Sequence, residues 1–111
     1  MHELAISEAI VSEVCDHVGA ARVQRVVVEI GKLSAVVPDA VRFCFDLAAK
    51  GTVVEDAALE ILEPPGVATC RACAARVELA DALAIACDRC GAIDLEVVSG
   101  NELRIKYVEV T

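Results

Sequence analysis

The spacing of apolar residues along the chain predicts two helices. Between residues 3 and 18, isoleucine, valine and leucine recur at helical intervals, acidic residues and serine lie on the other side, and Gly19 ends the pattern. A second helix is expected over residues 38–50. It begins with proline, Asp39 complements the positive end of the helix dipole, and Gly51 follows the last turn.

Strands are expected where β-branched and apolar residues run between glycine or proline breaks. Residues 23–30 alternate, with Val26, Val28 and Ile30 facing one way, and Gly31 ends the strand. The final strand is expected to return to the N-terminal sheet. The other predicted strands are residues 57–63, 95–98 and 102–110, the last two separated by a Ser-Gly-Asn turn.

Composition and charge limit the classes of protein to which the chain can belong. Its 111 residues suffice for one compact domain with a small second unit, and 57% hydrophobic residues suffice for a packed core. The net charge of −8 is opposite to what binding of phosphate backbones requires, so no nucleic acid is expected as partner. No apolar run approaches the roughly 20 residues of a membrane span, and no signal-peptide pattern follows Met1. We therefore expect a cytoplasmic protein without a membrane partner.

Four of the six cysteines form a pair of CxxC motifs, which are typical of a zinc site. Two residues between cysteines let a tight turn direct two thiolates at one ion about 2.3 Å away, and a second such turn completes a tetrahedron. Gly91, after the last cysteine of the pair, suits the backbone of this turn. Because four protein sulfurs leave no open position, the predicted zinc is structural and not catalytic. The predicted ligands are Cys70, Cys73, Cys87 and Cys90.

Two other uses of four thiolates are less well supported by the sequence. A rubredoxin-like iron site for electron transfer is disfavoured because the aromatic residues Phe43, Phe45 and Tyr107 all lie outside residues 64–94. A zinc ribbon that binds nucleic acid is disfavoured because the arginines of this segment are matched by acidic residues.

The order of these elements predicts an α+β fold with a zinc-ribbon-like Cys₄ domain inserted between strands. A Pro-Pro-Gly sequence at residues 64–66 breaks the chain where the cysteine segment begins. We therefore expect one α+β domain made of residues 1–63 and 99–111, and a zinc-binding domain made of residues 64–98. No Ser-His-Asp or Cys-His constellation and no glycine-rich phosphate loop is present, so the chain is not expected to be an enzyme.

Several stretches together resemble the HypA family, the nickel metallochaperones of NiFe-hydrogenase maturation. These are the initial MHE, VEIGKLSAVVP, RFCFDLAAKGT and the paired CxxC motifs, and the resemblance covers essentially the whole chain. It implies a nickel-binding domain of two helices packed on a small mixed β-sheet, joined to the zinc domain. It also implies that Ni²⁺ is a transient cargo, delivered to the hydrogenase large subunit alongside the GTPase HypB, by a monomer or a homodimer.

The N-terminus carries the nickel ligands that this resemblance implies. His2 alone could be a solvated chain end, because termini are usually mobile. Nickel(II), however, favours a square-planar set of nitrogen donors, which the imidazole of His2 and backbone nitrogens of Met1, His2 and Glu3 can supply. The Glu3 carboxylate could instead cap the first helical turn.

A fourth candidate nickel ligand is Asp39. Some members of the family have an acidic residue before the second helix that approaches the nickel, whereas this chain has Val37 at the best-matching position. Asp39, two residues on, can take that role or can serve only as a helix-start acid. His17, Cys15 and Cys44 are better explained by a helix C-terminus and by apolar helix faces.

Three functions follow from these motifs. The first is a nickel metallochaperone with a structural zinc site. The second is an adaptor whose zinc domain is only a docking platform, with His2 idle. The third, the iron redox protein, would be recognised by a red colour.

Overall fold

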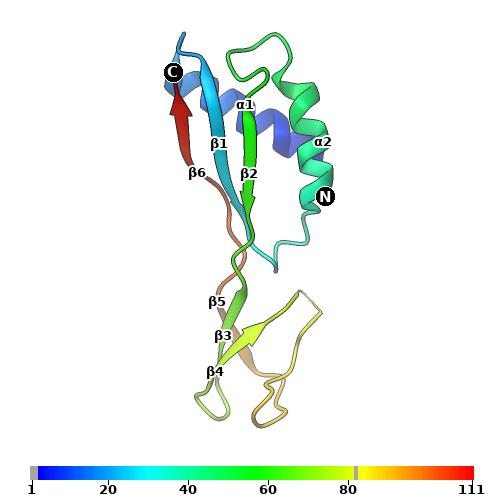
Figure 1. Ribbon diagram of the computed structural model, residues 1–111. Helices are drawn as coiled ribbons and strands as arrows, with labels where there is room; N and C mark the ends of the chain where they lie inside the picture. Colours follow the sequence, from blue (N-terminus) through cyan, green and yellow to red (C-terminus); the bar gives the residue numbers. More distant parts are fainter. Residues whose placement is uncertain (1–2, 82) are drawn as a thin grey trace. The chain divides into compact units, whose positions relative to one another are not determined.

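The computed structural model describes residues 3–81 and 83–111, which form two helices and six strands (Figure 1). Met1 and His2, two of the predicted nickel ligands, therefore lie outside the described residues. The elements in chain order are α1 (Glu3–Val18), β1 (Val23–Ile30), α2 (Pro38–Ala49), β2 (Ala58–Leu62), β3 (Gly66–Cys70), β4 (Arg76–Leu79), β5 (Leu95–Ser99) and β6 (Leu103–Val110).

The chain divides into two compact units, which are described separately. Unit 1 comprises residues 1–28, 36–61 and 104–111, and unit 2 comprises residues 29–35 and 62–103. The domain boundaries expected from the sequence stay a prediction. Within the described ranges, no helix combines the length and apolar character needed to cross a membrane.

A three-stranded sheet of order β2-β1-β6 carries unit 1. The arrows of β2 and β6 point in opposite directions in Figure 1, and both strands flank β1, so one pair is parallel and the other antiparallel. The sheet is therefore mixed. The parallel pair suits the helical crossover through α2, and the final strand returns to the N-terminal sheet as expected.

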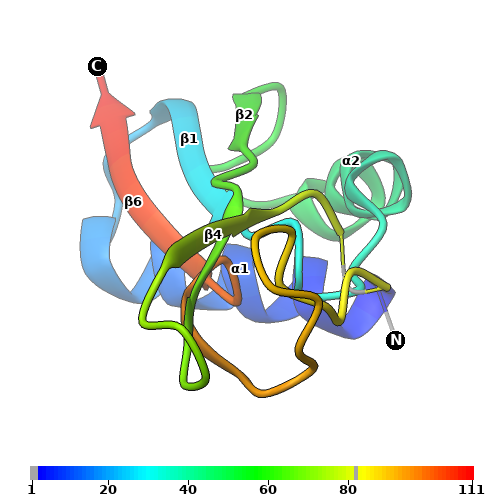
Figure 2. The ribbon, with the colours of Figure 1, turned by 90° about the horizontal axis from the view of Figure 1, so that it is seen from below.

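The core of unit 1 lies between this sheet and the helices. Figure 2 shows α1 lying across the sheet, and the hydroxyl of Ser7 on α1 donates a buried hydrogen bond to the Val41 carbonyl of α2 at 3.1 Å. The alternation expected for β1 is incomplete, because Val27 is buried as fully as Val26 and Val28. A central strand is covered on both faces, which a two-residue alternation does not predict.

Arg25 connects the three strands of this sheet. Its guanidinium on β1 donates to the Glu60 carboxylate of β2 at 3.0 Å and to the Glu109 carboxylate of β6 at 3.1 Å. It also donates to the Tyr107 hydroxyl at 3.0 Å, and its Cζ lies 5.8 Å from the ring centroid. These contacts fix the side chains on neighbouring strands relative to one another.

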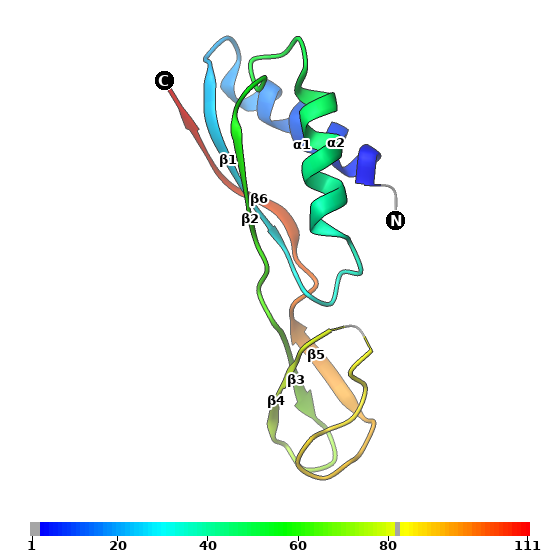
Figure 3. The ribbon, with the colours of Figure 1, turned by 45° about the vertical axis from the view of Figure 1, so that its right-hand side comes forward.

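Unit 2 contains a second sheet, of order β4-β3-β5, with both pairs antiparallel (Figure 3). Strands β3 and β4 were not expected from the sequence, because each has only four or five residues and lies beside a cysteine turn. The backbone N–H of Gly31 donates to the Glu102 carbonyl at 2.8 Å, and a Cβ at Gly31 would collide with the backbone of Gly100. Glycine is thus required where these segments meet.

The core of unit 1 predicts a large difference between two phenylalanines on the same helix. Phe45 is 1% exposed and Phe43 is 69% exposed. We expect Phe45→Ala to lower the free energy of unfolding by about 3–5 kcal/mol, because it leaves a cavity. Phe43→Ala should change it by less than about 0.5 kcal/mol. Urea unfolding followed by circular dichroism at the helical band measures both, and equal losses would contradict the described burial.

Candidate metal centre

The two cysteine motifs fold into turns with the same backbone hydrogen bonds. In the first turn, the Cys70 N–H donates to the Ala75 carbonyl at 2.9 Å, and the Ala74 N–H donates to the Cys70 carbonyl at 2.8 Å. The second turn repeats both bonds: Cys87 N–H to the Ala92 carbonyl at 2.8 Å, and Gly91 N–H to the Cys87 carbonyl at 2.9 Å. Each turn therefore presents two thiols on one side.

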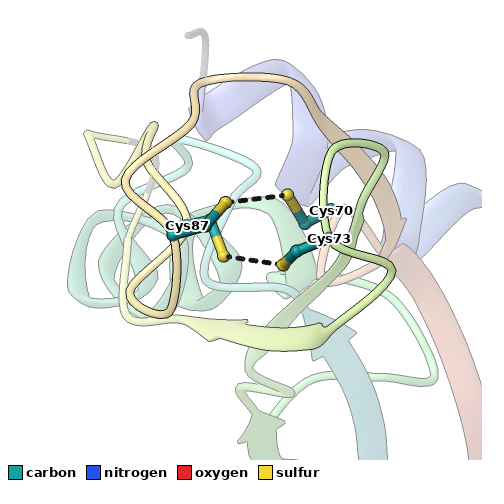
Figure 4. Close-up of side chains that lie close together, drawn as sticks. Cys70, Cys73 and Cys87 are labelled. Carbon is teal, nitrogen blue, oxygen red and sulfur yellow. Dashed lines mark hydrogen bonds between the residues drawn. The ribbon is translucent and has the colours of Figure 1, made fainter.

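The four thiols converge between these turns. Their sulfur atoms all lie within 4.8 Å of one another. Cys70 Sγ lies 3.7 Å from Cys90 Sγ, and Cys73 Sγ lies 3.7 Å from Cys87 Sγ, so each close pair joins one turn to the other. Figure 4 shows the sulfurs of Cys70, Cys73 and Cys87 turned toward one another.

These distances fit a tetrahedral metal site. Metal–sulfur bonds of about 2.3 Å in a tetrahedron place the sulfurs about 3.8 Å apart, close to the two 3.7 Å separations. A disulfide would require about 2 Å, and all four cysteines are free. The cluster can therefore hold a metal ion, although this geometry suits tetrahedral zinc and tetrahedral iron alike.

Electrostatics within the cluster also favour a cation. Backbone N–H groups of Cys90 and Arg89 lower the pKa of Cys87 to about 7. The backbone N–H of Ala75 acts in the same direction on Cys73, but desolvation and the neighbouring thiols together raise the pKa of Cys73 to about 12. Without a cation, the crowded sulfurs cannot all ionise near neutral pH. A metal ion must therefore displace protons, and its apparent affinity falls as the pH falls.

The cluster is part of the hydrophobic core of unit 2. Cys70 and Cys87 are buried together with Ala68, Val77 and Leu79. Because two of these five core side chains are predicted metal ligands, loss of the metal would disturb the core directly. The half-buried residues packed against this hydrophobic core are Leu33, Ala84, Ala92 and Leu95.

Arg71 contributes to this site although no motif in the sequence indicates it. Its guanidinium donates to the Asp94 carboxylate at 2.9 Å and lies 3.7 Å from the Glu96 carboxylate, while its backbone N–H donates to the Asp94 carbonyl at 2.9 Å. The hydrogen bond and the charges of these carboxylates raise the pKa of Arg71. Arg71 thus connects the first turn to the segment after the second. From the sequence alone, the arginines of this segment indicate only a charge balance.

The described part of the predicted nickel site lies in unit 1. Glu3 begins α1, and its carboxylate accepts a long hydrogen bond of 3.4 Å from the backbone N–H of Val37, which precedes α2. The carboxylate thus contacts the residue that precedes the second helix. Asp39 is exposed in the first turn of α2. Glu3 and Asp39 therefore lie at the same end of the helix pair.

The remaining candidates, His17, Cys15 and Cys44, lie on the two helices in positions that a structural role explains. His17, in the last turn of α1, has its Nδ1 3.0 Å from the Glu13 carbonyl. Cys15 and Cys44 are half-buried on α1 and α2. Among the described residues, the four-cysteine cluster is the one group of His, Cys, Asp and Glu side chains that is arranged to hold a metal ion.

Comparison with known proteins finds relatives along nearly the whole chain. A family model for HypA, described as hydrogenase/urease nickel incorporation, metallochaperone, matches residues 1–110. The hydrogenase maturation factors HypA of Trichormus variabilis and Nostoc punctiforme are 50% and 49% identical over 110 residues, covering 99% of this chain and 96% of each relative. The solution structure of the Ni metallochaperone HypA from Helicobacter pylori matches with a TM-score of 0.65 at 25% identity, covering 99% of this chain and 97% of that chain.

The matching turns predict opposite effects of glycine and alanine at equivalent positions. Ala74 has φ 62° and Gly91 has φ 77°, a left-handed conformation that costs an alanine roughly 1 kcal/mol. We expect Ala74→Gly to stabilise metal-loaded unit 2 by up to about 1 kcal/mol and Gly91→Ala to destabilise it by a similar amount. A Cβ at Gly91 meets no atom within 4 Å, so backbone strain alone is tested. Hydrogen exchange of unit 2 amides measures both changes, and destabilisation by Ala74→Gly would contradict this explanation.

The cluster also predicts that unit 2 depends on its metal. We expect Cys73→Ser to remove the bound metal and disorder the residues around the cluster while α1 and α2 stay folded, because a structural site contributes on the order of 10 kcal/mol. Cys15→Ser, a matched change at a half-buried cysteine of α1, should retain the metal. Elemental analysis and amide NMR spectra provide the measurements. An ordered, metal-free unit 2 in Cys73→Ser would show that the cluster is not required for folding.

Proposed function

We propose that this chain, which belongs to the HypA family of nickel-incorporation metallochaperones, has two activities. It binds Ni²⁺ at its N-terminus, and it delivers this Ni²⁺ to the large subunit of a NiFe-hydrogenase. The match of the family model over residues 1–110 carries this proposal. Proteins of this family act in hydrogenase maturation as chaperones, not as catalysts, so the chain is not an enzyme.

The proposed nickel donors are Met1, His2 and Glu3, with the side chain of Asp39 as a fourth candidate. Glu3 is the first residue of α1, and the first N–H groups of a helix have no partner within the helix, so its amide nitrogen is not committed to the helix ladder. Its carboxylate, in contrast, is already engaged by the Val37 N–H. We therefore assign the backbone nitrogen of Glu3, and not its side chain, to the nickel.

Zinc is the metal that we propose for the four cysteines. The sulfur separations fit it, and a closed thiolate site retains its ion while leaving no position for cargo. The metal content of the purified protein distinguishes zinc from iron. The visible spectrum is a second measurement, because iron bound by four thiolates absorbs visible light and zinc does not. The proposed partners are the GTPase HypB and the hydrogenase large subunit, and the proposed compartment is the cytoplasm.

The nickel site is tested by calorimetric titration of untagged, zinc-loaded protein. We expect His2→Ala to weaken nickel binding by at least about tenfold, since it removes an imidazole donor. Binding by the parent should release protons and weaken as the pH falls through about 6.5, where an imidazole becomes protonated.

His17→Ala is the matched control, because it removes the other histidine of the chain from a position at the end of α1. It should leave the nickel affinity unchanged. Asp39→Asn separates a ligand, whose loss weakens nickel binding, from a helix-start acid, whose loss lowers only stability. If His2→Ala bound nickel as tightly as the parent, with unchanged proton release, and still supported hydrogenase maturation, the N-terminus would not be the nickel site.

A further inference from the structure

Helix α2 carries two exposed apolar residues on a side that does not face the core of unit 1. The buried residues of the helix are Val41, Phe45 and Ala49. In contrast, Phe43 is 69% exposed and Leu47 is 50% exposed. These two residues are four positions apart, so they are neighbours on the same helix face. Figures 1 and 2 both show α2 at the margin of unit 1. The described part of unit 1 therefore leaves this apolar pair largely uncovered.

The apolar pair belongs to a longer stripe along α2. Four residues separated by three, four and three positions lie on one side of the helix, which is the arrangement along the seam of paired helices. They are Ala40, Phe43, Leu47 and Lys50. Ala40 is half-buried, and Lys50 is exposed directly after the last residue of the helix. Asp46 lies about a quarter turn away from this stripe and outside such a contact.

The order of these residues makes the stripe complementary to itself in an antiparallel pair of helices. When the pair is centred between Phe43 and Leu47, Phe43 of each copy lies opposite Leu47 of the other copy. Ala40 then lies opposite Lys50 of the other copy, and its small side chain leaves room for the stem of the lysine. A two-fold axis generates each of these contacts twice.

The charges at the two ends of α2 favour the same arrangement. Asp39, next to Ala40, is exposed in the first turn, and Lys50 is exposed at the opposite end. Within the described residues, no ion pair engages Asp39 or Lys50. An antiparallel pair brings the lysine of each copy to the aspartate of the other, and it places opposite ends of the helix dipoles side by side. A parallel pair would instead bring like charges together at both ends.

From these observations we infer that α2 is a docking face for a second copy of this chain, which pairs with it as an antiparallel helix dimer through Phe43 and Leu47. The contact is limited to one helix of 12 residues, which is small for a stable dimer. The net charge of −8 on each copy also opposes association. The dimer is therefore weak and populated only in concentrated solution, so unfolding in dilute solution reports on the monomer. This inference does not depend on nickel binding.

The dimer is tested by sedimentation equilibrium of full-length, zinc-loaded protein without nickel, at concentrations up to about 1 mM. The parent should show a reversible monomer–dimer equilibrium. Leu47→Ala should weaken dimerisation about tenfold or more, because it removes a leucine contact from each half of the interface. Leu4→Ala is the matched control, because Leu4 has nearly the same exposure, 48%, but lies on α1. It should change the dimerisation constant less than about twofold.

Two charge reversals test the antiparallel order of the contact. Asp39→Lys and Lys50→Glu should each weaken dimerisation several-fold, because like charges then meet at both ends of the pair. An equimolar mixture of these two variants should form a heterodimer about as well as the parent forms its dimer, because each lysine again meets a carboxylate of the other copy. Added salt should weaken the dimer of the parent.

Three results would overturn the inference. The first is a parent that stays monomeric over the whole concentration range. The second is a dimer that Leu47→Ala and Leu4→Ala weaken equally, or that neither weakens, because the contact would then lie elsewhere. The third is a mixture of the two charge variants that associates no better than either variant alone. Circular dichroism at the helical band checks that each variant keeps its helices.

Discussion

The convergence of four sulfur atoms is the constraint on which the rest of unit 2 depends. Among the described residues, the buried apolar cluster around the site consists of Cys70, Cys87, Ala68, Val77 and Leu79, so two of its five side chains are predicted metal ligands. A structural metal has an apparent contribution of about 10–16 kcal/mol, whereas one buried valine or leucine contributes about 1.5–3 kcal/mol. A metal ion at the four sulfurs would therefore outweigh any single apolar contact in this cluster.

The sequence predicts those parts of the fold that are determined by local chemistry. Helices over residues 3–18 and 38–50 were expected from apolar spacing and helix-end residues, and the observed elements end within one residue of these positions. The CxxC spacing likewise predicted which thiols meet, because two short turns determine most of the geometry. The family resemblance was confirmed over nearly the whole chain.

Features that arise from tertiary contacts were not predictable. Strands β3 and β4 are strands because they pair with each other, and runs of four or five residues carry too weak a pattern to reveal this. Gly31 was interpreted as a strand end, but its lack of a side chain also admits the backbone of Gly100. The bond from Val37 to Glu3 joins residues 34 positions apart, and nothing local to either residue indicates it.

A metallochaperone must retain one metal and release another, and the proposed sites separate these demands by donor type and position. Of the four cysteines, Cys70 and Cys87 belong to the core of unit 2, so an ion held there could not leave without disturbing Val77 and Leu79. The proposed nickel donors belong instead to a chain end, next to a helix start that the Glu3 carboxylate contacts through a single long bond. An imidazole donor becomes protonated near neutral pH, whereas thiolates bound to a divalent cation do not. Protonation or competition by a partner can therefore remove the cargo while unit 2 keeps its metal and its fold.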